Sequence, residues 1–156
     1  MNKYITLVGK EYWETLNSIW AVIKEGEFEA KEVHIISEKE NLKRAKVLKR
    51  DIKKLLSQYD LDTEVQISLV EDHDGLNLSD TIKEITDDEE NTAIDITGGR
   101  KYLVAGSLVN AYSIGYDHVF YLDVKKIEDI SKPYPTIPSD EISIIDFMKT
   151  NERGAH

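Results

Sequence analysis

Residues 97–101 (TGGRK) bring together chemical groups that bind phosphate. The two glycines let backbone N–H groups approach a ligand closely, the threonine adds a hydroxyl, and arginine and lysine add two positive charges. A short apolar run, 92–96, precedes the segment, and an apolar run of helical length follows it and ends at Gly115. A strand, a Gly-Gly turn and a helix in this order point amide groups and the positive end of a helix dipole at one spot. The segment therefore predicts an anion site.

The positions of Arg100 and Lys101 give a second reason to predict an anion site. Arg100 and Lys101 fall in the first turn of the predicted helix, where cations are disfavoured unless an anion is also present. Such local conflicts concentrate at functional sites, and a bound phosphate would resolve this one. A tight turn with two ordinary surface cations explains the same residues, so both interpretations stay open. The pattern is neither a P-loop nor G-x-G-x-x-G, which argues against the usual nucleoside triphosphatases and dinucleotide enzymes.

The surrounding elements alternate between strand and helix. Apolar periodicity and stop signals predict strands at 4–8, 33–37, 63–70, 92–96 and 119–124, and helices at 11–26, 38–59 (capped by Ser37), 78–88 and 100–115. Residues 125–138 should be mostly irregular, and 141–148 should form an edge strand. The fold class is α/β: a Rossmann-like parallel sheet of five to six strands with helices on both faces, in a single domain.

A strand order of 3-2-1-4-5 would place the topological switch point between strands one and four, where open α/β sheets bind ligands. The loops meeting there are 9–13 and 97–101. The first loop would contribute Gly9, Lys10, Tyr12 and Trp13. Aromatic rings beside cations suit a nucleotide, with a ring for the base and charge for the phosphates. Trp13 is equally well explained as a core residue.

The loop after the fourth strand also resembles a known family. Asp95-x-Thr97-x-x-x-Lys101 matches the Asp/Asn-x-Ser/Thr-x-x-x-Arg/Lys signature of the CRISPR-associated Rossmann-fold (CARF) domains, and Gly98 and Gly99 are similar to that family's common form of the loop. The resemblance covers the element order of roughly residues 2–124, and we expect a CARF-like domain over residues 1–148. A flexible tail is expected at 149–156, and its last three residues are either native or an expression remnant. The resemblance also implies a homodimer that binds a cyclic oligoadenylate across its two-fold axis in type III CRISPR antiviral signalling. Cyclic tetra-adenylate is expected first, because two-fold symmetry divides four nucleotides evenly.

The helix after the motif supports a dimer independently. Its predicted span has almost no polar face, and a helix that is apolar all round is buried on every side. One side would face the sheet, and a second copy would cover the other, bringing two 97–101 loops together. Replacing Arg100 and Lys101 should then abolish ligand binding and leave the melting temperature nearly unchanged.

The resemblance further implies a choice between two activities. Stand-alone relatives include ring nucleases, in which a ribose 2′-hydroxyl attacks the adjacent phosphate without a metal or cofactor, and here Lys101 would stabilise the developing charge. Some of these enzymes have a serine where this chain has Lys10, which weakens the prediction of catalysis more than that of binding. The alternative is a non-catalytic sensor domain of a larger or separate effector. A small enzyme acting on an ordinary mononucleotide is a third hypothesis.

Composition and net charge argue against several classes of function. The 156 residues have a net charge of −10 and no cysteine, which argues against general nucleic-acid binding and against disulfides or thiolate metal sites. We expect no membrane association and a cytoplasmic location. The basic stretch 43–54 is first explained as a solvated helix face, His73 as part of a solvated loop, and His34 and His118 as packing residues.

Overall fold

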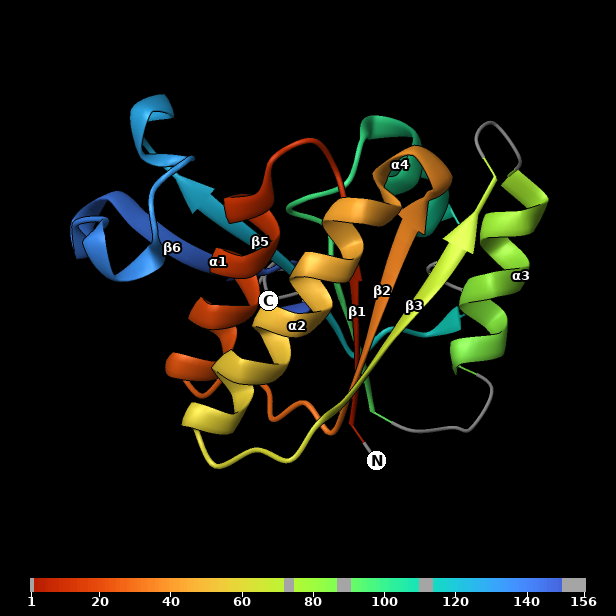
Figure 1. Cartoon of the computed structure of the whole chain (residues 1–156), viewed down its shortest axis with the longest axis horizontal. Helices are drawn as coiled ribbons and strands as arrows, with labels where there is room; N and C mark the ends of the chain where they lie inside the picture. The colour runs from red at the N-terminus through yellow and green to blue at the C-terminus, as the bar shows by residue number, and fades with distance from the viewer. Residues whose placement is uncertain (1, 72–74, 87–90, 110–113, 150–156) are drawn as a thin grey trace.

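The computed structural model describes residues 2–71, 75–86, 91–109 and 114–149. Strands and helices alternate along most of this length (Figure 1). The strands are β1 (Lys3–Leu7), β2 (Glu32–Glu38), β3 (Glu64–Val70), β4 (Thr92–Asp95), β5 (His118–Val124) and β6 (Ile142–Asp146). The helices are α1 (Tyr12–Lys24), α2 (Leu42–Gln58), α3 (Gly75–Thr86) and α4 (Lys101–Val109). Short 3₁₀ turns are η1 (Lys39–Asn41), η2 (Ile127–Asp129), η3 (Tyr134–Thr136) and η4 (Ser139–Glu141).

The strands form one six-stranded sheet in the order β3-β2-β1-β4-β5-β6. All neighbours are parallel except β6, which pairs antiparallel with β5 at the edge. In the centre Tyr4 of β1 lies opposite Val33 of β2 and Ala93 of β4. The predicted Rossmann-like architecture, the strand order and the edge strand near residues 141–148 are confirmed. The switch point therefore lies between β1 and β4, as predicted.

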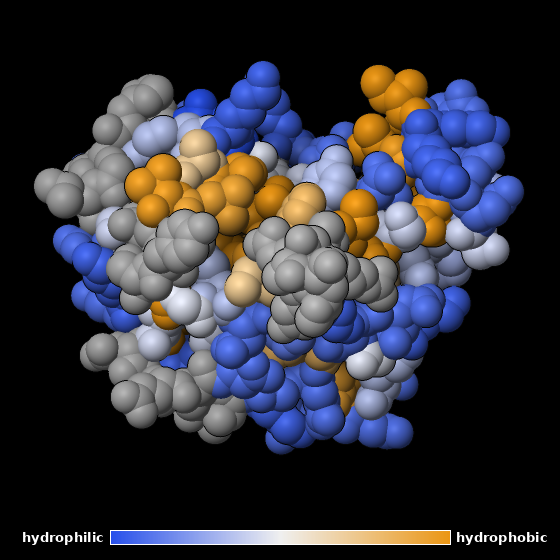
Figure 2. All heavy atoms as spheres, turned by 180° about the vertical axis from the view of Figure 1, so that it is seen from behind, coloured by the Kyte–Doolittle hydropathy of each residue, from blue (hydrophilic) through white to orange (hydrophobic). Residues whose placement is uncertain are grey.

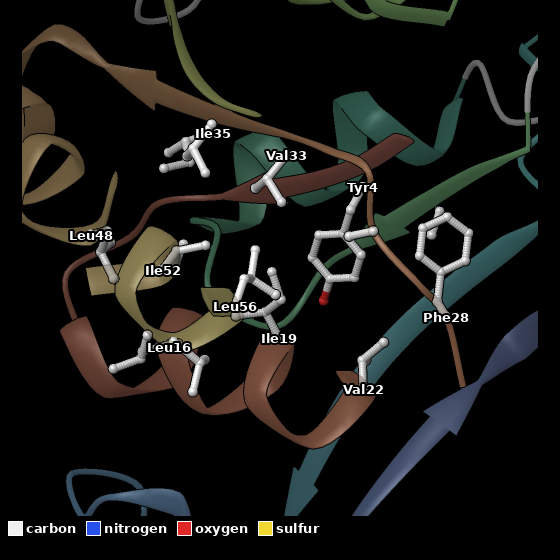
Figure 3. Close-up of a cluster of buried hydrophobic side chains, with 14 of the residues drawn as sticks. Tyr4, Leu16, Ile19, Val22, Phe28, Val33, Ile35, Leu48, Ile52 and Leu56 are labelled. Atoms are coloured by element: carbon white, nitrogen blue, oxygen red, sulfur yellow. The ribbon is translucent and has the colours of Figure 1, made fainter. Parts of the chain in front are cut away.

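Two cores cover the two faces of the sheet. On one face α1 and α2 pack over β1 and β2 through a cluster of buried side chains, part of which Figure 3 shows, including Tyr4, Ile19, Val33, Leu48 and Ile52. On the other face α3 and α4 pack over the sheet through Leu78, Ile82 and Leu103. Both faces of a central parallel strand are thus apolar, which explains why β1 is buried at every position. The sheet edge at the carboxyl ends of β1 and β4 is left for the loops.

The boundary between β2 and α2 differs from the prediction. Residues 38–59 were expected to form one helix capped by Ser37, but Glu38 is the last residue of β2 and α2 begins only at Leu42, after η1. The Ser37 hydroxyl donates to the carbonyl of Glu38 and caps no helix. Extending the strand by one residue satisfies a ladder position opposite Val70 of β3. The consequence is that Glu38 points a buried carboxylate toward the switch point, as described below.

Some predictions fall on residues outside the described ranges. His73, the end of the predicted helix at 87–88, residues 110–113 of the apolar helix and the tail at 150–156 are among them. Gly115, the predicted end of the apolar helix, adopts a φ of 70°, which glycine accepts readily. Among the helices of the described ranges, none is long and apolar enough to cross a membrane.

Candidate functional site

The β4–α4 loop is built on Asp95, the last residue of β4, whose side chain is fully buried. One carboxylate oxygen accepts hydrogen bonds from the hydroxyls of Tyr4 and Ser18. The other accepts from the backbone N–H of Thr97 at 3.0 Å and from its hydroxyl at 2.6 Å. Four donors from β1, α1 and the loop itself thus converge on one side chain. This network fixes the direction in which the chain leaves β4.

Burial raises the pKa of the Asp95 carboxyl, and the hydrogen bonds from Ser18, Thr97 and Tyr4 oppose that rise. Burial, with the adjacent Asp95, also raises the pKa of the Tyr4 phenol well above its ordinary value, so Tyr4 remains a donor. Both groups lie inside the core under the loop. Their arrangement supports a structural role.

Thr97 was predicted to bind phosphate through its hydroxyl. In the structure that hydroxyl donates to Asp95 and accepts the backbone N–H of Leu122 in β5 at 3.0 Å, with the Ser18 hydroxyl oxygen also at 3.0 Å. A small cavity of about 70 Å³ lies beside it, lined partly by Glu14 and Asn17 of α1. Thr97 therefore links β4, α1 and β5, and its single hydroxyl proton is already donated to Asp95.

The two glycine-containing loops lie in direct backbone contact. A β-carbon at Gly9 would lie 2.0 Å from the carbonyl oxygen of Gly98, and one at Gly98 would lie 2.3 Å from the Thr15 hydroxyl oxygen. At Gly99 the nearest atoms would belong to Leu7, at 2.9 Å. Gly9 is thus required for contact between the two loops, and Gly98 and Gly99 are required for packing of the β4–α4 loop against α1 and β1. The predicted meeting of loops 9–13 and 97–101 is confirmed.

A carboxylate of the chain itself balances the charge of Arg100 at the start of α4. Its guanidinium forms a two-pronged ion pair with Glu38, through Nε to Oε1 at 2.8 Å and through Nη2 to Oε2. The Glu38 side chain is 1% exposed and that of Arg100 is 32% exposed. Because β2 lies on the far side of β1 from β4, this ion pair crosses the carboxyl end of β1. The anion that sequence analysis required beside Arg100 is thus present within the chain.

Two further residues of this edge were not predicted. Arg44 of α2 donates from Nη1 to the carbonyl oxygen of Gly9 at 2.8 Å and to Asn41 Oδ1 at 2.9 Å, so it ties the β1 loop to the start of α2. Glu38 was missed because it was assigned to a helix. Arg44 was missed because it lies in a run of basic residues, and the only signal for it is its position in the first turn of that helix.

The remaining cations of the two loops are more accessible. Lys10 and Lys101 are both exposed, and neither forms an ion pair with a residue that the structure describes. They follow Gly9 and Arg100 directly, so each projects from one of the two loops in contact. Of the predicted phosphate-binding side chains, these two are the ones that retain accessible charge without a buried counter-ion.

The aromatic residues of the first loop lie on the α1–α2 side. The rings of Tyr12 and Trp13 contact edge to face with centroids 4.9 Å apart, and the Tyr12 hydroxyl donates to Asp51 of α2. Both rings are partly buried against the core. Tyr12 also lines a surface hollow of about 440 Å³ with Asn41, Arg44 and Val47. The structure therefore gives Trp13 the core contacts that were its alternative explanation, and leaves part of Tyr12 at the surface.

The two histidines that the structure describes, His34 and His118, lie away from the two loops. His34 is buried beside Glu32, and His118 bonds Asp146 at 2.7 Å and stacks on Phe120. Both pack as predicted, away from the switch point. Within the ranges that the structure describes, no three His, Asp or Glu side chains gather in a way that would hold a metal ion.

Comparison with known proteins supports the fold assignment. No family model matches the sequence, and no curated protein sequence matches it significantly. Among solved structures, the chain is similar to Can2 from Sulfobacillus thermosulfidooxidans, determined in complex with cyclic tetra-adenylate, with a TM-score of 0.58 and 15% sequence identity. The similarity covers 78% of this chain and 32% of the Can2 chain, so this chain spans about a third of that protein. At this identity the likeness shows a shared fold.

Proposed function

We propose that this chain is a CARF-like domain that binds a cyclic oligoadenylate, with cyclic tetra-adenylate as the first candidate, in type III CRISPR antiviral signalling in the cytoplasm. The observation that carries the proposal is the direct contact of the Gly9–Lys10 and Gly98–Lys101 loops at the switch point. This places two exposed lysines at the edge where open α/β sheets bind ligands. The likeness to Can2, solved with cyclic tetra-adenylate, supports this choice of ligand.

The ligand would lie across a two-fold axis between two copies. Helix α4 supports this arrangement, because only part of it is covered by its own chain. Leu103 and Ser107 are buried, whereas Leu108 is 36% and Val109 is 79% exposed. Figure 2 looks onto this side of the molecule and shows apolar surface (orange) in its upper part. A second copy packed on α4 would bury these side chains and bring two sets of loops to one ligand.

Within this site the residues would divide the work. Lys10 and Lys101 would contact phosphates as charged donors, and backbone groups at Gly98 and Gly99 would contribute where they face the ligand. Arg100 would stay paired with Glu38 and would add its positive charge beside the phosphates. Tyr12 would offer a ring to an adenine at the margin, with Trp13 behind it. Asp95 and Thr97 would act indirectly, by fixing the loop.

Binding and symmetry are tested together. Cyclic tri-, tetra- and hexa-adenylate are titrated into the protein by calorimetry, and its mass is measured in solution with and without ligand. We expect a dimer and a stoichiometry of one cyclic tetra-adenylate per two chains. Leu108→Glu with Val109→Glu should yield monomers that bind weakly. A monomeric wild-type protein at micromolar concentration, or the absence of binding to all three rings, would contradict the proposal.

Cleavage of the bound ring is the enzymatic extension of this proposal. The ribose 2′-oxygen would attack the adjacent phosphorus, the bond to the 5′-oxygen would break, and the proton lost by the 2′-hydroxyl would be balanced by protonation of the 5′-oxygen. The product is a linear oligoadenylate ending in a 2′,3′-cyclic phosphate. Lys101 would stabilise the charge on the phosphorane, an interaction stronger in the transition state than in the bound ligand.

A non-catalytic sensor is the alternative, and it is favoured by the Thr97 hydroxyl, whose single proton is donated to Asp95, because the loop then offers fewer groups to assist proton transfer. A single-turnover time course with saturating protein separates the two. A ring nuclease should convert the ring in the presence of EDTA, and Lys101→Ala should slow the rate constant beyond its effect on affinity. A ring that stays bound and intact for hours assigns the chain to the sensor class.

A further inference from the structure

Charge is divided unevenly between α2 and the rest of the molecule. Helix α2 contains seven Lys or Arg residues and one acidic residue, Asp51, so it has a net charge of +6 within a chain of net charge −10. The remaining residues together carry −16. A segregation of this size on one helix is a feature of the molecular surface and is independent of the loop motif.

The cations of α2 form a continuous outer surface. The α2 cation row consists of six exposed residues: Lys43, Lys46, Lys49, Arg50, Lys53 and Lys54. Their counterpart on the inner side is the apolar stripe that packs on the sheet, with Leu48 and Ile52 fully buried. From first to last the row extends about 16 Å along the helix axis. Within the row, Arg50 is paired with Asp51 at 3.0 Å.

One end of the α2 cation row lies at the proposed ligand site. Arg44, next to Lys43, donates to the carbonyl of Gly9, so the first turn of α2 touches the β1 loop that precedes Lys10. The hollow of about 440 Å³ lined by Tyr12, Lys43 and Val47 lies at this same end. Figure 1 shows α2 running from this edge of the sheet toward the opposite one. The row therefore begins at the switch point and leads away from it over the surface.

We propose that the α2 cation row is an interaction surface that captures the anionic oligonucleotide and guides it to the Lys10–Lys101 loops. This inference rests on the proposed function and adds a kinetic role to it. The phosphodiester ligand approaches a protein whose remaining surface is strongly negative and repels it. A local positive surface beside the mouth of the site raises the concentration of ligand there and accelerates association. Cations outside the final contact surface act mainly on the association rate and its salt dependence.

The geometry also predicts a gradient along α2. At an ionic strength near 0.1 M, charges act over a Debye length of about 10 Å. Lys43 and Lys46 lie at the end nearest Gly9, whereas Lys53 and Lys54 lie about two further turns along the helix. Reversing the charge of the near pair, Lys43 and Lys46, should slow ligand association strongly. Reversing the charge of the distant pair, Lys53 and Lys54, should slow it weakly, although both double substitutions alter the net charge equally. This pairing provides a matched control within one helix.

The experiment measures association and dissociation of fluorescently labelled cyclic tetra-adenylate by stopped flow at 50 mM and 500 mM salt. For Lys43→Glu with Lys46→Glu we expect the association rate constant to fall about tenfold at 50 mM and less than about twofold at 500 mM. The dissociation rate constant should stay within about twofold. Lys53→Glu with Lys54→Glu should reduce association by only about twofold to threefold. Lys31→Glu with Lys83→Glu changes two exposed lysines outside α2 and alters the total charge by the same amount. This variant should keep the association rate constant within about twofold of the wild-type value.

The outcomes separate the two proposals. A wild-type protein that does not bind the probe at either salt concentration overturns the proposed function, and this inference falls with it. A wild-type protein that binds, with equal association rates in the near, distant and outside variants, overturns the α2 cation row alone. A large rise in the dissociation rate constant of the near pair also overturns it, because Lys43 and Lys46 would then belong to the final binding site.

Discussion

Asp95 and Lys101 lie at the two ends of one loop segment, in opposite surroundings. Asp95 is fully buried and accepts four hydrogen bonds, whereas Lys101 is exposed at the first position of α4. Arg100 is intermediate, partly exposed and tied to a buried carboxylate. A seven-residue motif thus contains an architectural half and an accessible half. Residues of one short sequence pattern can therefore have different roles, and some of them contribute by positioning the backbone.

The largest effect on stability is expected at the buried end. Asp95→Ala leaves the Tyr4 and Ser18 hydroxyls and the Thr97 N–H without their acceptor inside the core. Loss of such a network should lower the free energy of unfolding by about 3–5 kcal/mol, measured by urea denaturation. Asp95→Asn retains one carbonyl oxygen, so its free energy of unfolding should lie between those of the wild-type protein and Asp95→Ala. A loss below about 1 kcal/mol for Asp95→Ala would show that water replaces the carboxylate at little cost.

Arg100→Ala should have the next largest effect. It leaves the carboxylate of Glu38, 1% exposed, without its counter-ion, at a cost of about 3 kcal/mol, the lower end of the range for a broken buried pair. The melting temperature should then fall by roughly 6–12 °C. This revises the expectation from the sequence that Arg100 is dispensable for stability. Adding Glu38→Gln should recover most of the loss, and an equally unstable double variant would show that packing of the guanidinium matters more than charge.

The dependence of stability on pH should be smaller and should have a defined sign. Burial raises the pKa of Asp95, so the folded chain binds this proton more readily than the unfolded chain does. Its contribution to stability is then fully present below its ordinary pKa of 3.8 and is lost as the pH rises through the raised value. Relative to Asp95→Asn, the wild-type free energy of unfolding should decline from about pH 4 upward. If the free energies of unfolding of the wild-type protein and Asp95→Asn depend on pH in the same way, the titration of Asp95 does not contribute to stability.

At the exposed end, Lys101→Ala should leave stability almost unchanged, within about 0.5 kcal/mol. Its affinity for cyclic tetra-adenylate should nevertheless fall by about 10- to 150-fold, the value of one charge-assisted hydrogen bond, and by more if symmetry doubles the loss. Lys83→Ala, at an exposed position on α3, is the matched control and should bind as wild type. Equal affinities for the two variants would remove Lys101 from the site.

The sequence was sufficient for the architecture because the strand and helix periods are clear and the strand order then defines the switch point. It also placed the 9–13 and 97–101 loops together. The boundaries of the strands and helices were harder to predict from the sequence, and the position of Glu38 illustrates the physical reason. A glutamate after an Ile-Ile-Ser run and before a charged helix suits either element, and only pairing with β3 decides between them.

The division of roles within the motif could not be predicted for a related reason. Residue types at 95, 97 and 100 state which donors and acceptors are present, but their partners come from distant positions. Asp95 meets Ser18 from α1, and Arg100 meets Glu38 from β2. A periodic pattern records which face of its own element a residue occupies. It contains no information on which side chain of another element will satisfy it.

The contact between the loops also limits how this molecule can change over evolutionary time. The atom that a β-carbon at Gly9 would meet, at 2.0 Å, is the backbone carbonyl oxygen of residue 98. Every amino acid at position 98 has that oxygen, so no second substitution there can make room for a side chain at position 9. Gly26 differs, because no atom lies within 4 Å of a β-carbon built there and only its φ of 69° restrains the choice. Many contacts between two side chains can change through a pair of compensating substitutions. The contact between positions 9 and 98 cannot, because one of its atoms belongs to the backbone.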